Sequence, residues 1–211
     1  MDVEKLKKEY YRLEKFKWDP HFSDLDFKWK CIPLISYKGL TGRESLKQPS
    51  GMPEDLCHQF KKTQFLRVCP YINELLDSFK CPKLRVRLMK MDPGAIVPDH
   101  YDTQGWQKRL VRMHIPIITH EDVYFFVDGE RAKMTTEGEL WYLNVMKLHS
   151  VSNESNITRV HLVFDLVVNR WVRDFFPKES FSDQISNFIH PRKKYVFKAL
   201  RYLHLSEAYT K

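Results

Sequence analysis

The sequence contains little cysteine, and its cysteines are not paired. Four occur among 211 residues, with no CxxC spacing: Cys31, Cys57, Cys69 and Cys81. A zinc site built on thiolates needs close pairs of cysteines, and small disulfide-dependent secreted domains use cysteine far more densely. The pattern therefore disfavours a thiolate metal centre and predicts reduced thiols in a cytoplasmic protein.

Long apolar runs are also missing. No stretch approaches the roughly 20 apolar residues that a membrane span needs, and residues 1–17 are charged throughout, without the apolar region of a signal peptide. No internal repeat or low-complexity segment is evident. We therefore expect a protein without a membrane span or secretory leader.

Acidic residues are outnumbered by basic ones. The chain has 35 Lys and Arg against 27 Asp and Glu, a formal net charge of +8. Such an excess attracts nucleic acid, anionic surfaces or acidic substrates without selecting among them. A basic surface on a protein that does not bind nucleic acid is the preferred interpretation.

The chain is rich in hydrophobic and aromatic residues, which favour β-sheet. It has 43% hydrophobic residues, with 14 Phe, 10 Tyr and 5 Trp, and aromatic side chains favour strands. Leu84–Met91 alternates between two faces, as a strand does. Other strands are expected at about 28–37, 95–100, 110–117, 122–127, 130–134, 139–144, 149–152 and 158–168. Many short strands joined by tight turns predict a mainly β fold, a sandwich or a double-sheet jelly roll.

Helical patterns flank these strands on both sides. The predicted helices cover 3–17, 54–62, 70–79, 179–190 and 192–206. The last of them is basic on one side. We expect an N-terminal helical and mixed flank over 1–81, a β core over 82–172 and a basic helical extension over 173–211.

Three residues of the predicted core form a candidate metal site. His100 and Asp102 are two residues apart at a strand end, so their side chains share a face. His149 supplies a second imidazole if its strand faces the first. Two imidazoles and a carboxylate on one face of iron form the facial triad, which leaves three positions open for a co-substrate and oxygen. Because H-x-D alone also occurs in solvent-facing loops, the interpretation depends on His149.

A fourth residue supports this interpretation. Arg159 follows His149 by ten residues and begins the apolar strand Val160–Val168. A planar guanidinium binds a carboxylate through two hydrogen bonds, which suits the far carboxylate of 2-oxoglutarate. The alternative is a surface salt bridge.

Other polar and aromatic residues have weaker interpretations. Three histidines lack a partner at ligand spacing and are expected to be structural or on the surface: His120, His161 and His190. Trp141 is expected in the core, whereas Trp106, in a polar loop, is a candidate substrate lid. Asp165 lies in an apolar strand, where it can orient another side chain.

Five motifs together resemble the aspartyl/asparaginyl β-hydroxylase family. They are Lys90-Met-Asp-Pro-Gly-Ala-Ile-Val-Pro-Asp-His100, Arg112-Met-His-Ile-Pro116, Glu137-Gly-Glu-Leu-Trp141, His149-Ser-Val-Ser-Asn153 and Arg159-Val-His-Leu-Val163. They span about 85–170 in the family's order. The segment Pro70-Tyr-Ile-Asn-Glu-Leu-Leu76 adds similarity to the bacterial branch that hydroxylates free proline at the cis-4 position.

The resemblance implies a double-stranded β-helix of the cupin-like jelly-roll type and a set of site residues. His100 and His149 match the iron-ligating histidines, and Arg159 matches the anchor of the 2-oxoglutarate carboxylate. Asp102 matches a carboxylate that the free amino-acid hydroxylases have and the animal protein-modifying members lack.

Further matches concern the co-substrate. Arg112 and His114 match a pair that lies against it, and the backbone around Met91 matches the lining of the same pocket. Met89 stands where the animal members have a small serine.

These features predict an Fe(II)- and 2-oxoglutarate-dependent dioxygenase. The expected reaction consumes O2, is aided by ascorbate, and hydroxylates an amino acid, free or within a larger molecule, with release of succinate and CO2. Desaturation or demethylation by the same chemistry is one alternative. A non-catalytic basic jelly roll that binds an anionic partner is another. The helical flanks are candidates for a homodimer contact.

Overall fold

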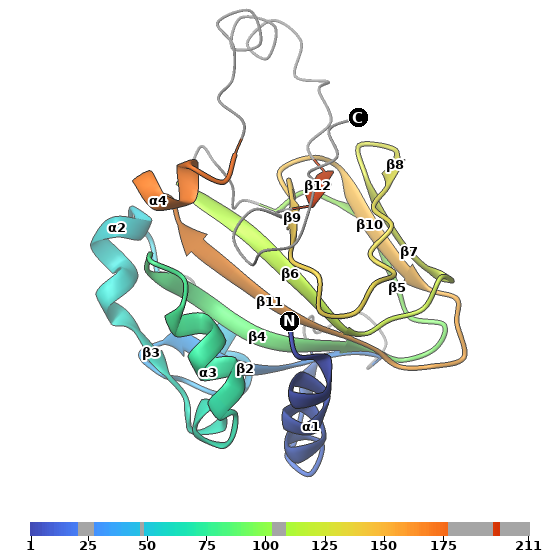
Figure 1. Ribbon diagram of the computed structural model, residues 1–211, viewed down its shortest axis with the longest axis horizontal. Helices are drawn as coiled ribbons and strands as arrows, with labels where there is room; N and C mark the ends of the chain where they lie inside the picture. The colour runs from blue at the N-terminus through green and yellow to red at the C-terminus, as the bar shows by residue number, and fades with distance from the viewer. Residues whose placement is uncertain (21–27, 47–48, 103–108, 177–195, 199–211) are drawn as a thin grey trace, which may run out of the picture.

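The computed structural model describes residues 1–20, 28–46, 49–102, 109–176 and 196–198. Two antiparallel sheets dominate the fold (Figure 1). The large sheet has the order β1-β2-β4-β11-β6-β9-β12, with β3 paired to β2, and the small sheet has the order β5-β10-β7-β8. This arrangement confirms the predicted mainly β, double-sheet jelly roll.

Most strands lie close to their predicted positions. The large sheet is made of β1 (Asp19–Pro20), β2 (Trp29–Tyr37), β3 (Phe60–Lys62), β4 (Lys83–Met91), β6 (Leu110–Ile118), β9 (Trp141–Leu143), β11 (Arg159–Val167) and β12 (Val196–Lys198). The small sheet is made of β5 (Ile96–His100), β7 (Val123–Val127), β8 (Glu130–Arg131) and β10 (His149–Asn153). The strands expected over 130–134 and 139–144 are thus shorter than predicted.

Most of the α-helices (α) and short 3-10 helices (η) precede the strand-rich region. They are α1 (Val3–Leu13), η1 (Gly42–Leu46), α2 (Pro53–Leu56), η2 (Cys57–Gln59), η3 (Gln64–Val68), α3 (Pro70–Asp77) and α4 (Arg170–Arg173). No helix in the described ranges has the length and apolar character to cross a membrane.

One face of the large sheet is apolar and packs against α1 and α3. Leu6 and Leu13 of α1 join Ile72 of α3 in one cluster with Leu88 and Phe164 of the sheet. These side chains are almost completely buried. Burial of this face stabilises the fold, at roughly 25 cal/mol per Å² of apolar surface removed from water.

The opposite face of the large sheet is turned toward the small sheet and is unusually polar. Its central strands β4, β6 and β11 carry buried charged and imidazole side chains there: Arg85, Arg87, Arg112, His114, Arg159, His161 and Asp165. Because buried charges are costly unless they are paired or bind a ligand, this inner face is the place to look for a site.

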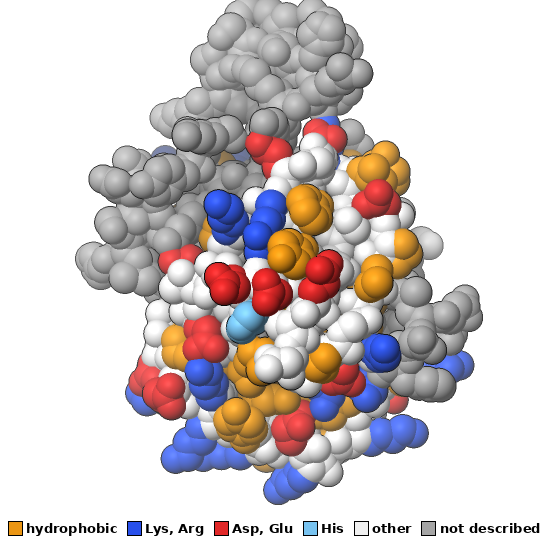
Figure 2. Space-filling model, turned by 90° about the vertical axis from the view of Figure 1, so that its right-hand side faces the viewer, with side chains coloured by type: hydrophobic (Ala, Val, Ile, Leu, Met, Phe, Trp, Pro, Cys, Tyr) orange, Lys and Arg blue, Asp and Glu red, His pale blue; other side chains and the backbone are white. Residues whose placement is uncertain are grey.

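The small sheet has one apolar inner face and one exposed outer face. Val97, Phe125 and Val151 pack with Met91 between the sheets. On the outside, Ile96 and Phe126 are exposed, and Figure 2 shows apolar and acidic side chains side by side on this part of the molecule.

Two predicted helices in the N-terminal flank are longer than those in the structure. The first helix ends at Leu13 instead of residue 17, because the indole of Trp18 donates to the Leu13 carbonyl and the chain turns there. In the range 54–62, only the first part is helical, since Phe60–Lys62 pairs with β2. Sheet pairing there outweighs local propensity.

The prediction of a helix over 192–206 is wrong for residues 196–198. Val196–Lys198 forms a strand that pairs with β9. The rest of that range, and the helix expected over 179–190, lie outside the described residues. We retain the division at 81 and 172 as a proposal, noting that β2 of the N-terminal flank is hydrogen-bonded to β4 of the core.

Candidate active site

His100, Asp102 and His149 lie together at one end of the small sheet. His100 ends β5 and His149 begins β10, and the two are partners in the β5–β10 register. Their ring centroids are 4.1 Å apart. One potential ligand atom from each of the three residues lies within 4.8 Å of the other two. Strand pairing therefore brings together residues that are nearly fifty positions apart in the chain.

Backbone carbonyls orient both imidazoles. The Nδ1 atom of His100 is 2.8 Å from the Pro98 carbonyl oxygen, and that of His149 is 2.9 Å from the Lys147 carbonyl oxygen. A ring that donates from Nδ1 keeps the Nε2 lone pair for a metal. Burial lowers the pKa of His149, which favours the neutral ring that metal binding requires.

Asp102 is held by both its backbone and its carboxylate. Its amide donates to the Val145 carbonyl at 2.9 Å. Its carboxylate contacts Arg112, which comes from β6 of the large sheet. This contact links the two sheets at the site and fixes the third potential ligand.

Arg112 is in turn held by Asp165. The Nε and Nη2 atoms of Arg112 donate to the two carboxylate oxygens of Asp165 at 2.8 and 3.2 Å. Burial lowers the pKa of Arg112, but Asp165 and Asp102 outweigh this effect and raise it. The guanidinium is therefore charged at all ordinary pH values, and Asp165 orients a neighbouring side chain, as expected.

Arg159 is a buried cation that has no acidic partner among the described residues. Only 2% of its surface is exposed, and its Nη2 atom is 2.7 Å from Nδ1 of His161. Its Nε atom has no partner in the described ranges. Burial lowers the pKa of Arg159 to about 9. An enclosed, unneutralised guanidinium is suited to bind the carboxylate of a ligand.

His114 of β6 lies on the same inner face as Arg159 and His161. Its ring contacts those of His161 and Phe125, with centroids 6.0 and 5.8 Å apart. Neither ring nitrogen has a hydrogen-bond partner within the part of the chain that the structure describes. Burial, Arg159 and Arg112 hold its pKa well below the usual range. His114 is thus a neutral imidazole with hydrogen-bonding capacity available to a ligand.

The residues at the site fit iron and 2-oxoglutarate. The two imidazoles and one carboxylate are the donor set of the facial triad, and their Nδ1 atoms are already engaged. The inner face offers an enclosed guanidinium and unpartnered imidazole nitrogens. Unpaired buried polar groups are costly, so a dicarboxylate ligand would supply acceptors for the N–H donors among them.

The other residues singled out in the sequence, Met91, Trp141 and Met89, lie in or beside the core. Met91 is fully buried in the core between the sheets, and its carbonyl accepts from Asn153 at 2.9 Å. Trp141 packs at the margin of the same core, as expected. Met89 packs with Cys31 and Val163.

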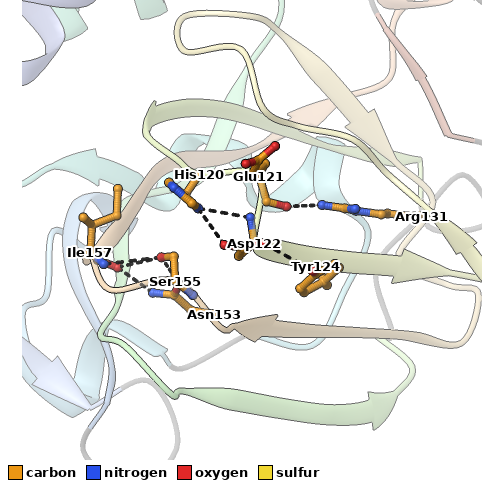
Figure 3. Close-up of polar contacts among 8 residues, drawn as sticks. All are labelled: His120, Glu121, Asp122, Tyr124, Arg131, Asn153, Ser155 and Ile157. Atoms are coloured by element: carbon orange, nitrogen blue, oxygen red, sulfur yellow. Dashed lines mark hydrogen bonds and ion pairs between the residues drawn. The ribbon is translucent and has the colours of Figure 1, made fainter.

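The histidines without a predicted ligand role differ in position. His161 is fully buried beside Arg159, a structural position as expected. His120 lies at the surface, 3.4 Å from Asp122, and the neighbouring Glu121 carbonyl accepts from the Arg131 side chain (Figure 3). His190 and Trp106 lie outside the described residues.

Sequence reasoning missed two buried arginines, Arg85 and Arg87 of β4. Both belong to the inner face of the large sheet. The sequence contained a signal for this position. Both arginines share a strand face with Met91, which had been matched to the lining of the co-substrate pocket. The alternation over Leu84–Met91 predicted a strand with two faces, without indicating that the face with the arginines is buried.

Comparison with known proteins gives distant but consistent matches. The chain is 23% identical over 196 residues to the L-proline cis-4-hydroxylase of Rhizobium meliloti (strain 1021), covering 92% of this chain and 67% of that protein. It is 24% identical over 159 residues to L-proline cis-3-hydroxylase 1 of a Streptomyces species, covering 74% and 51%. The chain thus spans about two thirds and half of these relatives.

A solved structure and a family description also match. KdgF from a Halomonas species aligns with 10% identity and a TM-score of 0.37, covering 74% of this chain and 91% of that one. The family described as aspartyl/asparaginyl β-hydroxylase matches residues 1–168.

Proposed function

The chain belongs to the aspartyl/asparaginyl β-hydroxylase family, and from this premise we propose that it is an Fe(II)- and 2-oxoglutarate-dependent hydroxylase of an amino acid. The observation that carries the proposal is the convergence of His100, Asp102 and His149 within 4.8 Å. They lie beside an inner face that contains the unneutralised guanidinium of Arg159. The named activity of the two curated relatives supports an amino acid as the substrate.

Each residue has a role in this proposal. His100, Asp102 and His149 would hold the iron, with both histidines presenting Nε2. When bound, iron and 2-oxoglutarate would allow O2 to oxidise a C–H bond to C–OH, with one oxygen atom going to the product, the other to succinate, and CO2 released. Arg159 would bind the far carboxylate of the co-substrate, and Arg112 keeps Asp102 in position.

Two neutral groups complete the pocket. His114, which remains uncharged, would donate a hydrogen bond to the co-substrate. The ring of Phe125 lies parallel to that of His149, with ring centroids 6.0 Å apart, and the imidazole is buried. Exclusion of water strengthens the polar contacts inside the site.

The direct test is succinate release by the purified chain with Fe(II), ascorbate, 2-oxoglutarate and a panel of free amino acids and peptides. We expect His149→Ala to lower the rate at least roughly 100-fold. Loss of a residue that only supports a metal ligand already lowers metal affinity or activity by up to about 100-fold, and His149 is a proposed ligand itself. His120→Ala, at a surface histidine, is the matched control and should keep the wild-type rate. Unchanged succinate release in His149→Ala would refute the proposed site.

Two alternatives give different results in the same assay. Desaturation or demethylation also releases succinate, but the product loses hydrogen or a methyl group instead of gaining oxygen, which mass spectrometry distinguishes. A non-catalytic basic binding protein would take up no iron and would bind polyanions in a salt-dependent manner. Membership of a hydroxylase family favours the enzyme.

A further inference from the structure

The chain crosses twice between the two sheets beside Asn153, the last residue of β10. Residues 92–95 lead from β4 of the large sheet to β5 of the small one, and residues 154–158 lead back from β10 to β11. The backbone amide of Asn153 donates to the Ala95 carbonyl at 2.9 Å, and its carbonyl accepts from the Gly94 amide at 2.8 Å. Asn153 therefore joins the two crossings.

The side chain of Asn153 uses its full hydrogen-bonding capacity at this place. It is completely buried. Its Nδ2 atom donates to the Ile157 carbonyl at 2.8 Å and to the Met91 carbonyl at 2.9 Å. Its Oδ1 atom accepts from the Ser155 amide at 3.2 Å and lies 2.6 Å from the Ser155 hydroxyl (Figure 3). Because a carboxamide offers two N–H donors and one oxygen with two acceptor positions, all four are engaged.

One of these four bonds connects the sheets directly. It runs from the last residue of β10, in the small sheet, to the carbonyl of Met91, the last residue of β4, in the large sheet. Because the bond is buried, it is stronger than the same bond in water. The Asp102–Arg112 contact joins the sheets at the candidate metal ligands, and Asn153 joins them at the opposite end of β10 from His149.

This connection lies between the two halves of the proposed active site. His149, a candidate metal ligand, precedes Asn153 by four residues in β10. Met91 faces Arg159, the candidate carboxylate anchor, in the register of β4 and β11. The carboxamide of Asn153 thus ties the strand that carries His149 to the strand pair that carries Arg159. A ligand that contacts both the metal and Arg159 depends on the spacing that this tie maintains.

We propose that Asn153 is a positioning residue, which sets the spacing between the metal ligands and the carboxylate anchor Arg159. The inference rests on the proposed function. Asn153 acts through the Met91 carbonyl and through the shape of residues 154–158. Its loss should therefore leave each half of the site intact and alter only their separation. A ligand that binds the metal alone should be unaffected, whereas a ligand that spans both halves should bind more weakly.

Two ligands of different reach test this role without turnover. Oxalate chelates a metal ion and extends no further, whereas 2-oxoglutarate has a second carboxylate at its far end. The Kd of each ligand is measured by calorimetry on the full chain loaded with Mn(II). In Asn153→Ala we expect 2-oxoglutarate to bind roughly tenfold more weakly, because small displacements of positioned groups have effects of this order or larger. The Kd values of Mn(II) and oxalate should be nearly unchanged.

A destabilised variant elsewhere separates a positioning role from a merely structural one. Asn153→Ala removes buried hydrogen bonds and should also lower Tm. Glu9→Ala should lower Tm at the contact between α1 and α3, on the apolar face of the large sheet, without changing the ratio of the two affinities. If Asn153→Ala does not fold, Asn153→Ser serves in its place, because its hydroxyl can bond within the turn but is too short to reach Met91.

Three results would overturn the inference: an equal loss of affinity for oxalate and 2-oxoglutarate in the Asn153 variant, no loss for either ligand, or the same selective loss in Glu9→Ala. Each of these leaves the proposed function intact. A wild-type chain that binds neither Mn(II) nor 2-oxoglutarate would instead refute the proposed function, so the two failures are distinguishable.

Discussion

The buried carboxylate of Asp165 is kept charged by the arginines around it. Asp165 is buried, which raises its pKa, but Arg112 and Arg85 outweigh burial and lower the pKa below its usual range. A carboxylate whose folded pKa is lowered stabilises the protein above its unfolded pKa of about 3.9. That contribution is lost as the pH falls through the folded value.

Asp165→Asn should therefore destabilise the protein at neutral pH. Removing one partner of a buried ion-pair cluster costs roughly 3–5 kcal/mol, because the remaining charges stay buried without compensation. Urea unfolding at pH 7 measures the difference. The difference between wild type and variant should remain nearly constant down to about pH 4 and shrink only at lower pH. Asp55→Asn, at an exposed carboxylate, should have little effect, and an equal loss in both variants would contradict the argument.

The thiols make a second prediction at this scale. Cys57 is partly exposed, whereas Cys31, Cys69 and Cys81 are buried. Burial raises the pKa of Cys31 to about 11 and those of Cys69 and Cys81 to about 12. Because the thiolate is the reactive form, a disulfide reagent should modify one thiol rapidly in the native protein and the others only on unfolding. The rapid phase should disappear in Cys57→Ser; its persistence there would disprove the assignment.

At the scale of elements, α1 and α3 are joined by a buried carboxylate. Glu9 of α1 accepts hydrogen bonds from the amides of Tyr71 and Ile72, at 2.6 and 2.8 Å, at the start of α3. The first amides of a helix lack intrahelical partners and carry partial positive charge. Pro70 at the first helical position needs no such partner. One side chain therefore satisfies the helix start and fixes how the two helices pack.

Glu9→Ala should lower the free energy of unfolding by roughly 2–3 kcal/mol, since two buried amides lose charge-assisted hydrogen bonds. Chemical denaturation measures this loss. Glu9→Gln keeps one acceptor oxygen and should lose less. Glu4→Ala, on the exposed side of the same helix, is the matched control. If Glu4→Ala were as destabilising as Glu9→Ala, intrinsic helix stability and not the link between helices would explain the result.

At the scale of the whole molecule, the site depends on how the two sheets face each other. The two imidazoles come from the small sheet, while Arg112, which holds Asp102, comes from the large one. A metal bound at the site therefore stabilises the folded arrangement by mass action. A ligand present at 100 times its Kd contributes about 2.7 kcal/mol.

For a chain of this length, we expect saturating Mn(II) to raise Tm by roughly 5–10 °C. The shift should be reversed by a chelator and absent in His149→Ala, but present in His120→Ala. Thermal unfolding followed by circular dichroism provides the measurement. An equal shift in His149→Ala would mean that the metal binds elsewhere.

The sequence by itself determined the local features of this protein. Alternation of side chains and frequent turns indicate the strands and the two-sheet class, because both depend on neighbouring residues. The H-x-D spacing places His100 and Asp102 on one face of a strand end for the same reason. The motif around Pro70 likewise predicts a helix at its observed position.

Only the tertiary structure decided which face of each strand is interior. A period of two shows that Arg85 and Arg87 share a face with Met91, but it does not show whether that face meets water or the second sheet. Sheet pairing also overrode the helical pattern at Phe60–Lys62. The meeting of His149 with His100 depends on the register between distant strands. Local pattern sets the shape of each element, whereas burial and register arise only when the elements pack.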